Sequence, residues 1–120
     1  MSETPYKVII TPFAEAALQA TYDYIRLELL AEQAADDWLD LMEREIFNLS
    51  CLPGRYPLVR REPWHSERIH VQPVKGYNIY FWINEEQWKV FVIDVVNHRM
   101  QQDKRLTKST QSFRQTISEQ

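Results

Sequence analysis

One nearly continuous apolar run, WKVFVIDVV at residues 88–96, constrains the fold of this chain more than any other feature. Its length and its β-branched residues are typical of a strand, and a strand that is apolar on both faces is expected at the centre of a sheet covered on both sides. The run stops at a polar, amide-rich segment, NHRMQQD at residues 97–103. The sequence therefore predicts a central strand that ends beside a histidine–arginine pair.

Three further segments predict the rest of a sheet. Residues 68–74 (RIHVQPV) and residues 77–84 (YNIYFWIN) alternate between two sets of side chains, as strands do. A turn at residues 85–87 joins the second of these to the apolar run as a hairpin. Near the N-terminus, the β-branched stretch at residues 6–10 (YKVII) predicts a short fourth strand.

Two amphipathic helices are predicted between the first strand and the hairpin. Thr11 and Pro12 suit a helix N-cap and first helical position, and apolar residues then recur at helical spacing to about Leu30. A second helix with one apolar face follows and ends at Pro53-Gly54. Because the connection between the helices is short, an antiparallel helical hairpin is expected.

The predicted order is β-α-α-β-β-β, which describes an α+β domain with a helical hairpin on one face of a small, mostly antiparallel sheet. Residues 1–106 are expected to form a single domain, with residues 55–66 as a loop. The Ser-, Thr- and Gln-rich tail at 107–120 is expected to be frayed or weakly helical, using Leu106, Phe113 and Ile117.

Composition excludes several classes of function. The only glycines, Gly54 and Gly76, cannot form a phosphate-binding loop, and the single cysteine, Cys51, cannot form an internal disulfide or a cysteine-rich zinc site. No apolar stretch approaches the roughly 20 residues that span a bilayer, and the N-terminus does not have the pattern of a signal peptide. A cytoplasmic protein without a membrane partner, metal or cofactor is expected.

Charge is distributed unevenly around a net charge of −3. Residues 13–50 hold nine acids and two arginines, whereas residues 51–120 hold eleven Lys or Arg, seven acids and all three histidines. The second half could therefore meet phosphate locally. The alternative is two solvated faces that differ by chance, and the sequence leaves both open.

The polar side of the predicted sheet carries the candidate functional residues. With the helices on one face, the other face is expected to present cations and aromatics, namely Arg68, His70, Asn78, Tyr80 and Trp82, with His98 and Arg99 at the strand end. Such a surface suits base stacking and phosphate binding, although aromatic residues on strands more often pack. The loop residues Arg60 and Arg61 are either solvated or contact the acids of a partner.

The segment VKGYNIYFWINEEQWKVFVIDVVNHR resembles the RelE/ParE superfamily of bacterial toxins. The resemblance covers about residues 6–105 and is carried by Gly76-Tyr77 opening a strand, an acidic turn, an apolar strand and then His98-Arg99. It implies a small cytoplasmic toxin that forms a hetero-oligomer with a cognate antitoxin. It also implies one of two activities: metal-free cleavage of ribosome-bound mRNA in the RelE branch, or binding and inhibition of DNA gyrase in the ParE branch.

Departures from the nuclease branch favour the ParE-like activity. That branch commonly has an arginine after the strand-opening tyrosine, where this chain has Asn78, and a C-terminal tyrosine, whereas no tyrosine follows Tyr80. The alternative is a ribosome-dependent endoribonuclease with Arg68, His70, His98 and Arg99 as catalytic residues. A further alternative is an inactive protein-binding module. For target or antitoxin binding, the expected residues are Asn78, Tyr80, Trp82, Arg60 and Arg61.

Overall fold

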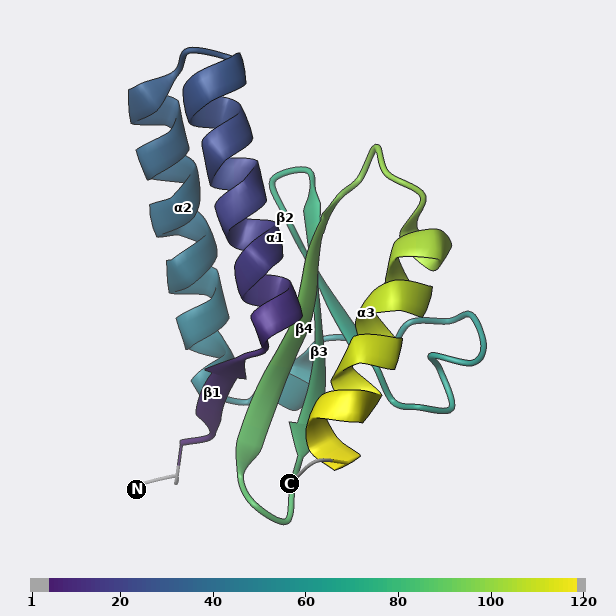
Figure 1. Cartoon of the computed structure of the whole chain (residues 1–120). Coiled ribbons are helices and arrows are strands. Elements are labelled where there is room, and N and C mark those ends of the chain that lie inside the picture. Colours follow the sequence, from purple (N-terminus) through teal and green to yellow (C-terminus); the bar gives the residue numbers. More distant parts are fainter. Residues whose placement is uncertain (1–4, 119–120) are drawn as a thin grey trace.

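The structure is a computed structural model that describes residues 5–118, and it contains four strands and three α-helices (Figure 1). In chain order these are β1 (Lys7–Ile10), α1 (Pro12–Asp23), α2 (Glu32–Phe47), β2 (His70–Val74), β3 (Tyr77–Asn84), β4 (Lys89–Asn97) and α3 (Gln102–Ser118). A π-helical turn, η1 (Tyr24–Glu28), extends α1, and short 3₁₀ turns, η2 (Asn48–Ser50) and η3 (Pro53–Arg55), follow α2.

The sheet has the order β1-β4-β3-β2, in which β1 runs parallel to β4 and the other pairs are antiparallel. The predicted α+β class and the mostly antiparallel sheet are thereby confirmed. β4 is a central strand, and its side chains from Val90 to Val96 are buried on both faces. A bulge opposite Tyr80 and Phe81 adds one residue to β4.

The start of α1 is held both by its cap and by the sheet. Thr11 accepts a hydrogen bond from the Ala14 backbone N–H at 3.3 Å, and its own hydroxyl donates to the Val92 carbonyl at 2.9 Å. Pro12 occupies the first turn, where a missing N–H is harmless. The predicted helix start is confirmed, and the cap residue also joins α1 to β4.

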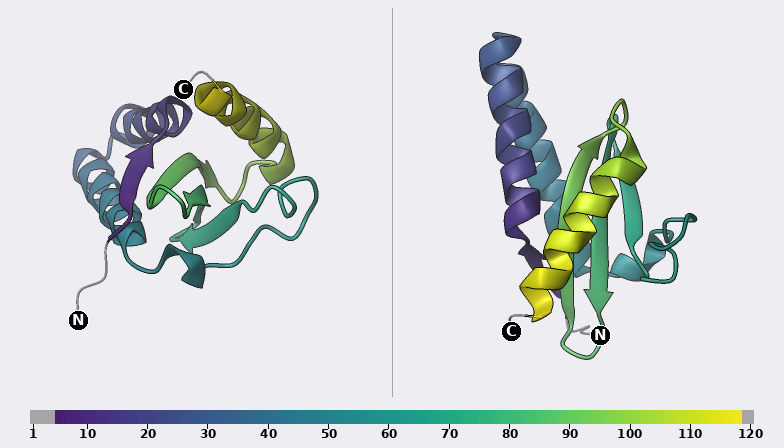
Figure 2. Two further views of the ribbon diagram at one scale, coloured as in Figure 1. Left: turned by 90° about the horizontal axis from the view of Figure 1, so that it is seen from below. Right: turned by 45° about the vertical axis from the view of Figure 1, so that its right-hand side comes forward.

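One face of the sheet is covered by the helical hairpin, as the sequence predicts. Ala14 and Leu18 of α1 and Met42 and Ile46 of α2 pack with sheet residues that include Phe81. Ile79 and Phe81 are fully buried in this layer. The hairpin extends past the sheet, so its far end has no layer beneath it (Figures 1 and 2).

The other face of the sheet is covered too, which differs from the exposed surface expected there. α3 lies on the opposite side from the hairpin (Figure 2), and its Leu106 and Phe113 are buried with Val59, Trp64 and Ile69 of the preceding loop region. Residues 107–118 belong to the helix α3, which ends at Ser118, and residues 119–120 of the predicted tail lie outside the described residues. The apolar residues of α3 are sparse, but Leu106 and Phe113 belong to the apolar cluster on this face of the sheet, and their burial stabilises the helix.

No helix within residues 5–118 is long and apolar enough to span a membrane.

Candidate functional site

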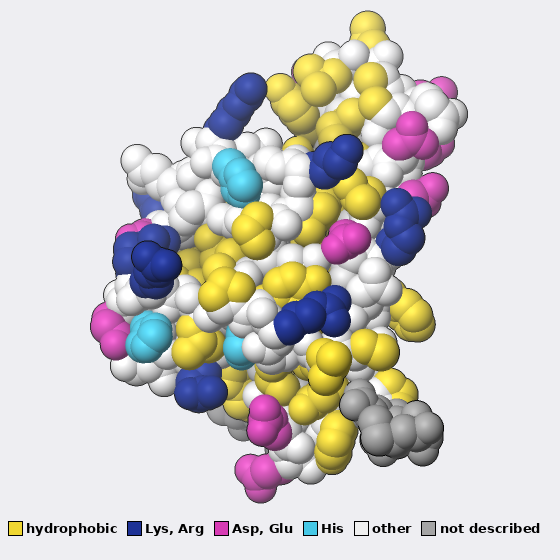
Figure 3. Space-filling model, turned by 180° about the vertical axis from the view of Figure 1, so that it is seen from behind, with side chains coloured by type: hydrophobic (Ala, Val, Ile, Leu, Met, Phe, Trp, Pro, Cys, Tyr) yellow, Lys and Arg dark blue, Asp and Glu magenta, His cyan; other side chains and the backbone are white. Residues whose placement is uncertain are grey.

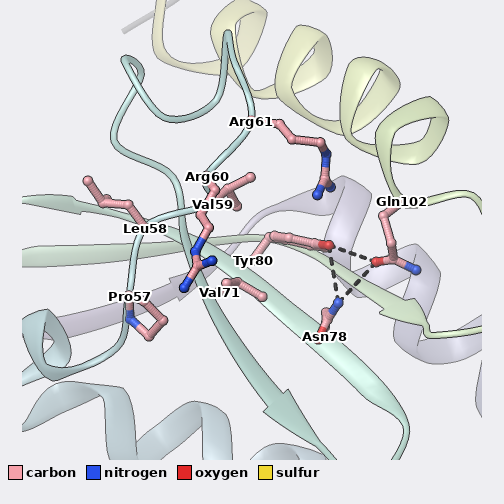
Figure 4. Close-up of a pocket in the computed structure, with 9 residues that line it drawn as sticks. All are labelled: Pro57, Leu58, Val59, Arg60, Arg61, Val71, Asn78, Tyr80 and Gln102. Atoms are coloured by element: carbon pink, nitrogen blue, oxygen red, sulfur yellow. Dashed lines mark hydrogen bonds between the residues drawn. The ribbon is translucent and has the colours of Figure 1, made fainter.

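A hollow of about 320 Å³ lies where β3, the loop at residues 57–61 and the start of α3 meet (Figure 4). It is lined by Pro57, Leu58, Val59, Arg60, Arg61, Val71, Asn78, Tyr80 and Gln102. Asn78 and Tyr80 point the same way because they are two residues apart on one strand. Four of the predicted site residues thus share one hollow: Arg60, Arg61, Asn78 and Tyr80.

Gln102 connects these residues to the end of β4. Its Oε1 accepts hydrogen bonds from the Tyr80 hydroxyl at 2.7 Å and from Asn78 Nδ2 at 3.2 Å (Figure 4). Its Nε2 donates to the backbone carbonyls of Asn97 and Met100. Gln102 was not among the predicted site residues. In the sequence, the only indication of a role for Gln102 was its place in the amide-rich segment after the central strand.

His98 adjoins the same network at the strand end. Its Nε2 lies 2.8 Å from Asn78 Oδ1, and because an amide oxygen only accepts, Nε2 carries the hydrogen in this arrangement. The His98 backbone N–H donates to the Gly76 carbonyl, so the loop that opens β3 fixes its position. Arg99 is exposed, and its backbone N–H donates to the Asn97 side chain. His98 and Asn78 are therefore in direct contact.

Tyr80 acts as a hydrogen-bond donor in this hollow. Burial of its side chain raises the pKa of Tyr80 above its ordinary value, and its hydrogen bond with Asn78 opposes this shift. The phenol consequently stays protonated at neutral pH and keeps its bond to Gln102. A tyrosine that acted as a general base would need the opposite shift of its pKa.

The two arginines at the mouth of the hollow differ in their partners. Arg61 forms an exposed ion pair with Asp103 of α3. Arg60 is also exposed and forms no ion pair with any residue among 5–118. Arg60 is therefore available to an anionic group of a partner, while Arg61 would first have to leave Asp103.

His70 lies on the hairpin face of the sheet and not with Tyr80. In the β2–β3 register His70 is opposite Phe81, whereas Val71 is opposite Tyr80. The imidazole stacks on the Phe81 ring at 5.1 Å and donates from Nδ1 to the Tyr56 carbonyl at 2.8 Å. Burial lowers the pKa of His70, and the bond to Tyr56 only partly offsets that effect.

Arg68 and His70 also lie at the wrong end of the sheet to join His98 and Arg99. Arg68 and His70 line a second hollow, of about 510 Å³, beside the β3–β4 turn. Phe81, opposite His70, and Tyr77, near His98, are four residues apart, which is about 13 Å along a strand. The structure therefore divides the four predicted catalytic residues into two separate pairs.

Two solved structures share this arrangement of strands and helices. A chain of the ParDE toxin–antitoxin system from P. aeruginosa aligns with a TM-score of 0.62 and 14% sequence identity, over 79% of this chain and 98% of that one. A chain of the RelBE2 toxin–antitoxin complex from Mycobacterium tuberculosis aligns with a TM-score of 0.58 and 22% identity, over 78% and 98%. This chain has the RelE/ParE toxin fold. No family model matches its sequence, and a search of curated proteins finds no match.

Trp82 has a packing role in this RelE/ParE fold. Its ring lies 5.8 Å from Phe113 of α3 and 6.0 Å from Phe91 of β4, within the second apolar layer. The indole is only partly exposed and is not a free platform for a base. The sequence predicted at most a weakly helical tail here, and the packing of α3 over this face of the sheet accounts for the difference.

A buried ion pair between Asp94 and Arg105 joins the central strand to α3. This pair was not predicted from the sequence. Asp94 has no exposed surface, and Arg105 reaches it with two hydrogen bonds, at 2.9 and 3.2 Å. Burial raises the pKa of Asp94, and the Arg105 guanidinium opposes this shift. The sequence feature that could have indicated this pair is Asp94 itself, a single acid within an apolar strand. A carboxylate buried in this way requires a partner.

The described residues contain no group of three or more His, Cys, Asp or Glu side chains that could hold a metal ion.

Proposed function

We propose that this protein is the toxin of a type II toxin–antitoxin system and that it inhibits growth by binding an essential target, with DNA gyrase as the expected target. The likeness to chains of the RelBE2 and ParDE toxin–antitoxin assemblies supports the toxin role. The separation of Arg68 and His70 from His98 and Arg99 carries the choice of binding over cleavage.

Metal-free RNA cleavage requires a base, an acid and cations around one phosphate. At the end of β4 this chain offers His98, whose Nε2 is engaged by Asn78. On β3, Tyr80 has a raised pKa that keeps it protonated, which does not suit the role of base. The hydrogen bonds among Asn78, Tyr80 and Gln102 bind these groups to one another. An arrangement of this kind suits the recognition of a partner better than proton transfer.

A ribosome-dependent endoribonuclease is the second candidate, and one observation favours it. Arg60 and Arg61 lie at the mouth of the hollow that Asn78 lines, and His98 contacts Asn78 directly. Two cations and an imidazole are suitable groups for holding a phosphate. An inactive toxin fold that only binds proteins is the third candidate.

The partner expected for all three candidates is a cognate antitoxin that assembles with this chain into a hetero-oligomer. Arg60 and Arg61 are exposed cations that line the hollow, and Arg99 is an exposed cation next to His98. We expect the acidic side chains of the antitoxin to contact them, because exposed charge pairs steer association.

Two assays of the purified protein and one measurement of growth on expression separate the candidates. Inhibition of gyrase supercoiling, with ribosome-bound mRNA left intact, is the expected result. Cleavage of ribosome-bound mRNA that disappears in His98→Ala or Arg99→Ala would instead establish the nuclease and reject the binding proposal. Expression that does not slow growth would reject both toxin roles and leave the inactive module.

A further inference from the structure

The far end of the helical hairpin exposes a cluster of large apolar side chains, which we call the tip. Its members are Tyr24, Leu27, Leu29 and Leu30, each more than half exposed. Figure 3 shows hydrophobic side chains gathered at this end of the hairpin, beyond the edge of the sheet. Grouped apolar exposure of this kind marks an interaction surface more often than a single exposed leucine does.

Leu30 has a backbone conformation that glycine adopts with less strain than any other residue. Its φ of +52° lies in the left-handed region, which strains a side chain that branches beyond Cβ, and 86% of its surface is exposed. It therefore contributes little packing while it occupies a strained backbone position. Strain of this kind is concentrated at functional sites.

The helix that leads into the tip is also irregular. α1 ends in the π-helical turn η1, where the Leu29 backbone N–H bonds to the Tyr24 carbonyl at 3.2 Å. π-turns within helices are uncommon and frequently occur at functional sites. The π-turn and the positive φ of Leu30 thus fall together on the same apolar cluster.

The charges around the tip restrict what can cover it. The charged residues from 23 to 37 are five acids, Asp23, Glu28, Glu32, Asp36 and Asp37, and one base, Arg26. Arg26 lies 3.8 Å from Asp23, whereas Glu28 and Glu32 are exposed and form no ion pair among the described residues. This acidic rim repels nucleic acid, an anionic membrane and the tip of a second copy.

We propose that the tip is the surface with which this protein binds its target, and that the target has an apolar pocket surrounded by Lys or Arg side chains. This inference rests on the proposed function, since it names the surface that the target-binding toxin uses. Leu30 enters the pocket, where its burial on binding offsets the strain, and Glu28 and Glu32 pair with the basic rim. The hollow near Gln102 is left to the antitoxin.

The chain provides a matched pair of variants for the test. Leu30→Gly removes the apolar side chain at the tip and relieves the backbone. Leu52→Gly makes the same change at a residue with φ +48° that is 62% exposed and lies at the opposite end of α2. Growth arrest on expression, inhibition of supercoiling by purified gyrase, and thermal unfolding are measured for the wild type and both variants.

The expected result is loss of activity only at the tip. Leu30→Gly needs at least about tenfold more protein for half-inhibition of gyrase and no longer arrests growth, because a central apolar anchor carries much of an interface's binding energy. Its unfolding temperature is unchanged or higher. Leu52→Gly keeps full activity. Charge reversal at Glu28 and Glu32 weakens inhibition, while charge reversal at Glu86, an exposed residue of the β3–β4 turn, does not.

The remaining outcomes overturn the inference. An active wild type with an equally active Leu30→Gly, or equal losses in Leu30→Gly and Leu52→Gly, rejects the tip and leaves the proposed function intact. An inert wild type rejects the proposed function and the tip together. A wild-type dimer that Leu30→Gly converts to a monomer would assign the tip to self-association and reject it as a target surface.

Discussion

Asp94 is the residue whose environment is most demanding in this fold. It is fully buried on the central strand and depends on Arg105 and on the Val95 backbone N–H for its hydrogen bonds. A lone carboxylate at this position is costly, and the hydrogen bonds from Arg105 satisfy it while they join β4 to α3.

Removal of either partner should be destabilising. Arg105→Ala is expected to lower the free energy of unfolding by about 3 kcal/mol, because it leaves the buried Asp94 carboxylate without its partner. Asp94→Ala is expected to lower it by less, because the partly exposed Arg105 guanidinium can be solvated by water. Urea unfolding measures this, and Lys104→Ala, an exposed neighbour on α3, is the control. A loss in Arg105→Ala no larger than in Lys104→Ala would contradict the structural role of the pair.

His70 should make stability depend on pH. Burial lowers its pKa in the folded state, so the unfolded chain binds the proton more readily. Stability therefore falls as the pH drops through the unfolded value of about 6.5 toward the lowered folded value. His70→Gln cannot titrate and should lose less stability over this window. Urea unfolding between about pH 8 and about pH 5 compares the two proteins, and equal losses would contradict the prediction.

At the scale of elements, α3 is the least expected part of the molecule. Its apolar residues are few and Ser, Thr and Gln separate them, a pattern that by itself predicts a weak helix. Leu106 and Phe113 nevertheless fill the second layer against Phe91 and Trp82. The helix forms despite this pattern because the sheet face beneath it is apolar and is buried by Leu106 and Phe113.

Truncation of one aromatic side chain should show how far the fold depends on α3. Phe113→Ala is expected to lower the free energy of unfolding by about 3 kcal/mol, since it opens a cavity between α3 and the sheet. Ile117→Ala, at a partly exposed position one turn further on, should cost less than half as much. Denaturant unfolding measures both. Similar small losses in the two variants would mean that α3 is loosely attached.

The whole molecule has two apolar layers with β4 between them. The apolar run at residues 88–96 already indicated a strand covered on both sides, but only one cover, the helical hairpin, was recognised in the sequence. The face expected to be open is instead packed by α3 and the loop before β2. For this reason Asn78 and Tyr80 line a hollow, with His98 bonded to Asn78, and these residues do not lie on a broad binding surface.

The candidate site was predictable only in part for the same reason. The alternation of side chains along a strand shows that two sets face opposite ways. It does not show which set faces which layer, because a shift of one residue in the strand pairing exchanges the two sets. β2 carries apolar residues on both faces, so its pattern does not decide between them. Arg68 and His70 were therefore assigned to the face of Tyr80, while the register places Val71 there. Gln102 could not be linked to Tyr80, because they are 22 residues apart and meet only through tertiary packing.

The sequence by itself determined the order and type of the elements as far as β4, the central place of that strand, the cap at Thr11 and the RelE/ParE likeness. These depend on local periodicity and on the chemistry of neighbouring residues. Only the tertiary structure decided that α3 closes the second face, that Asp94 pairs with Arg105 and that Arg68 and His70 lie apart from His98. Each of these depends on contacts between distant residues, whose free energy comes from burial and cannot be read from a local pattern.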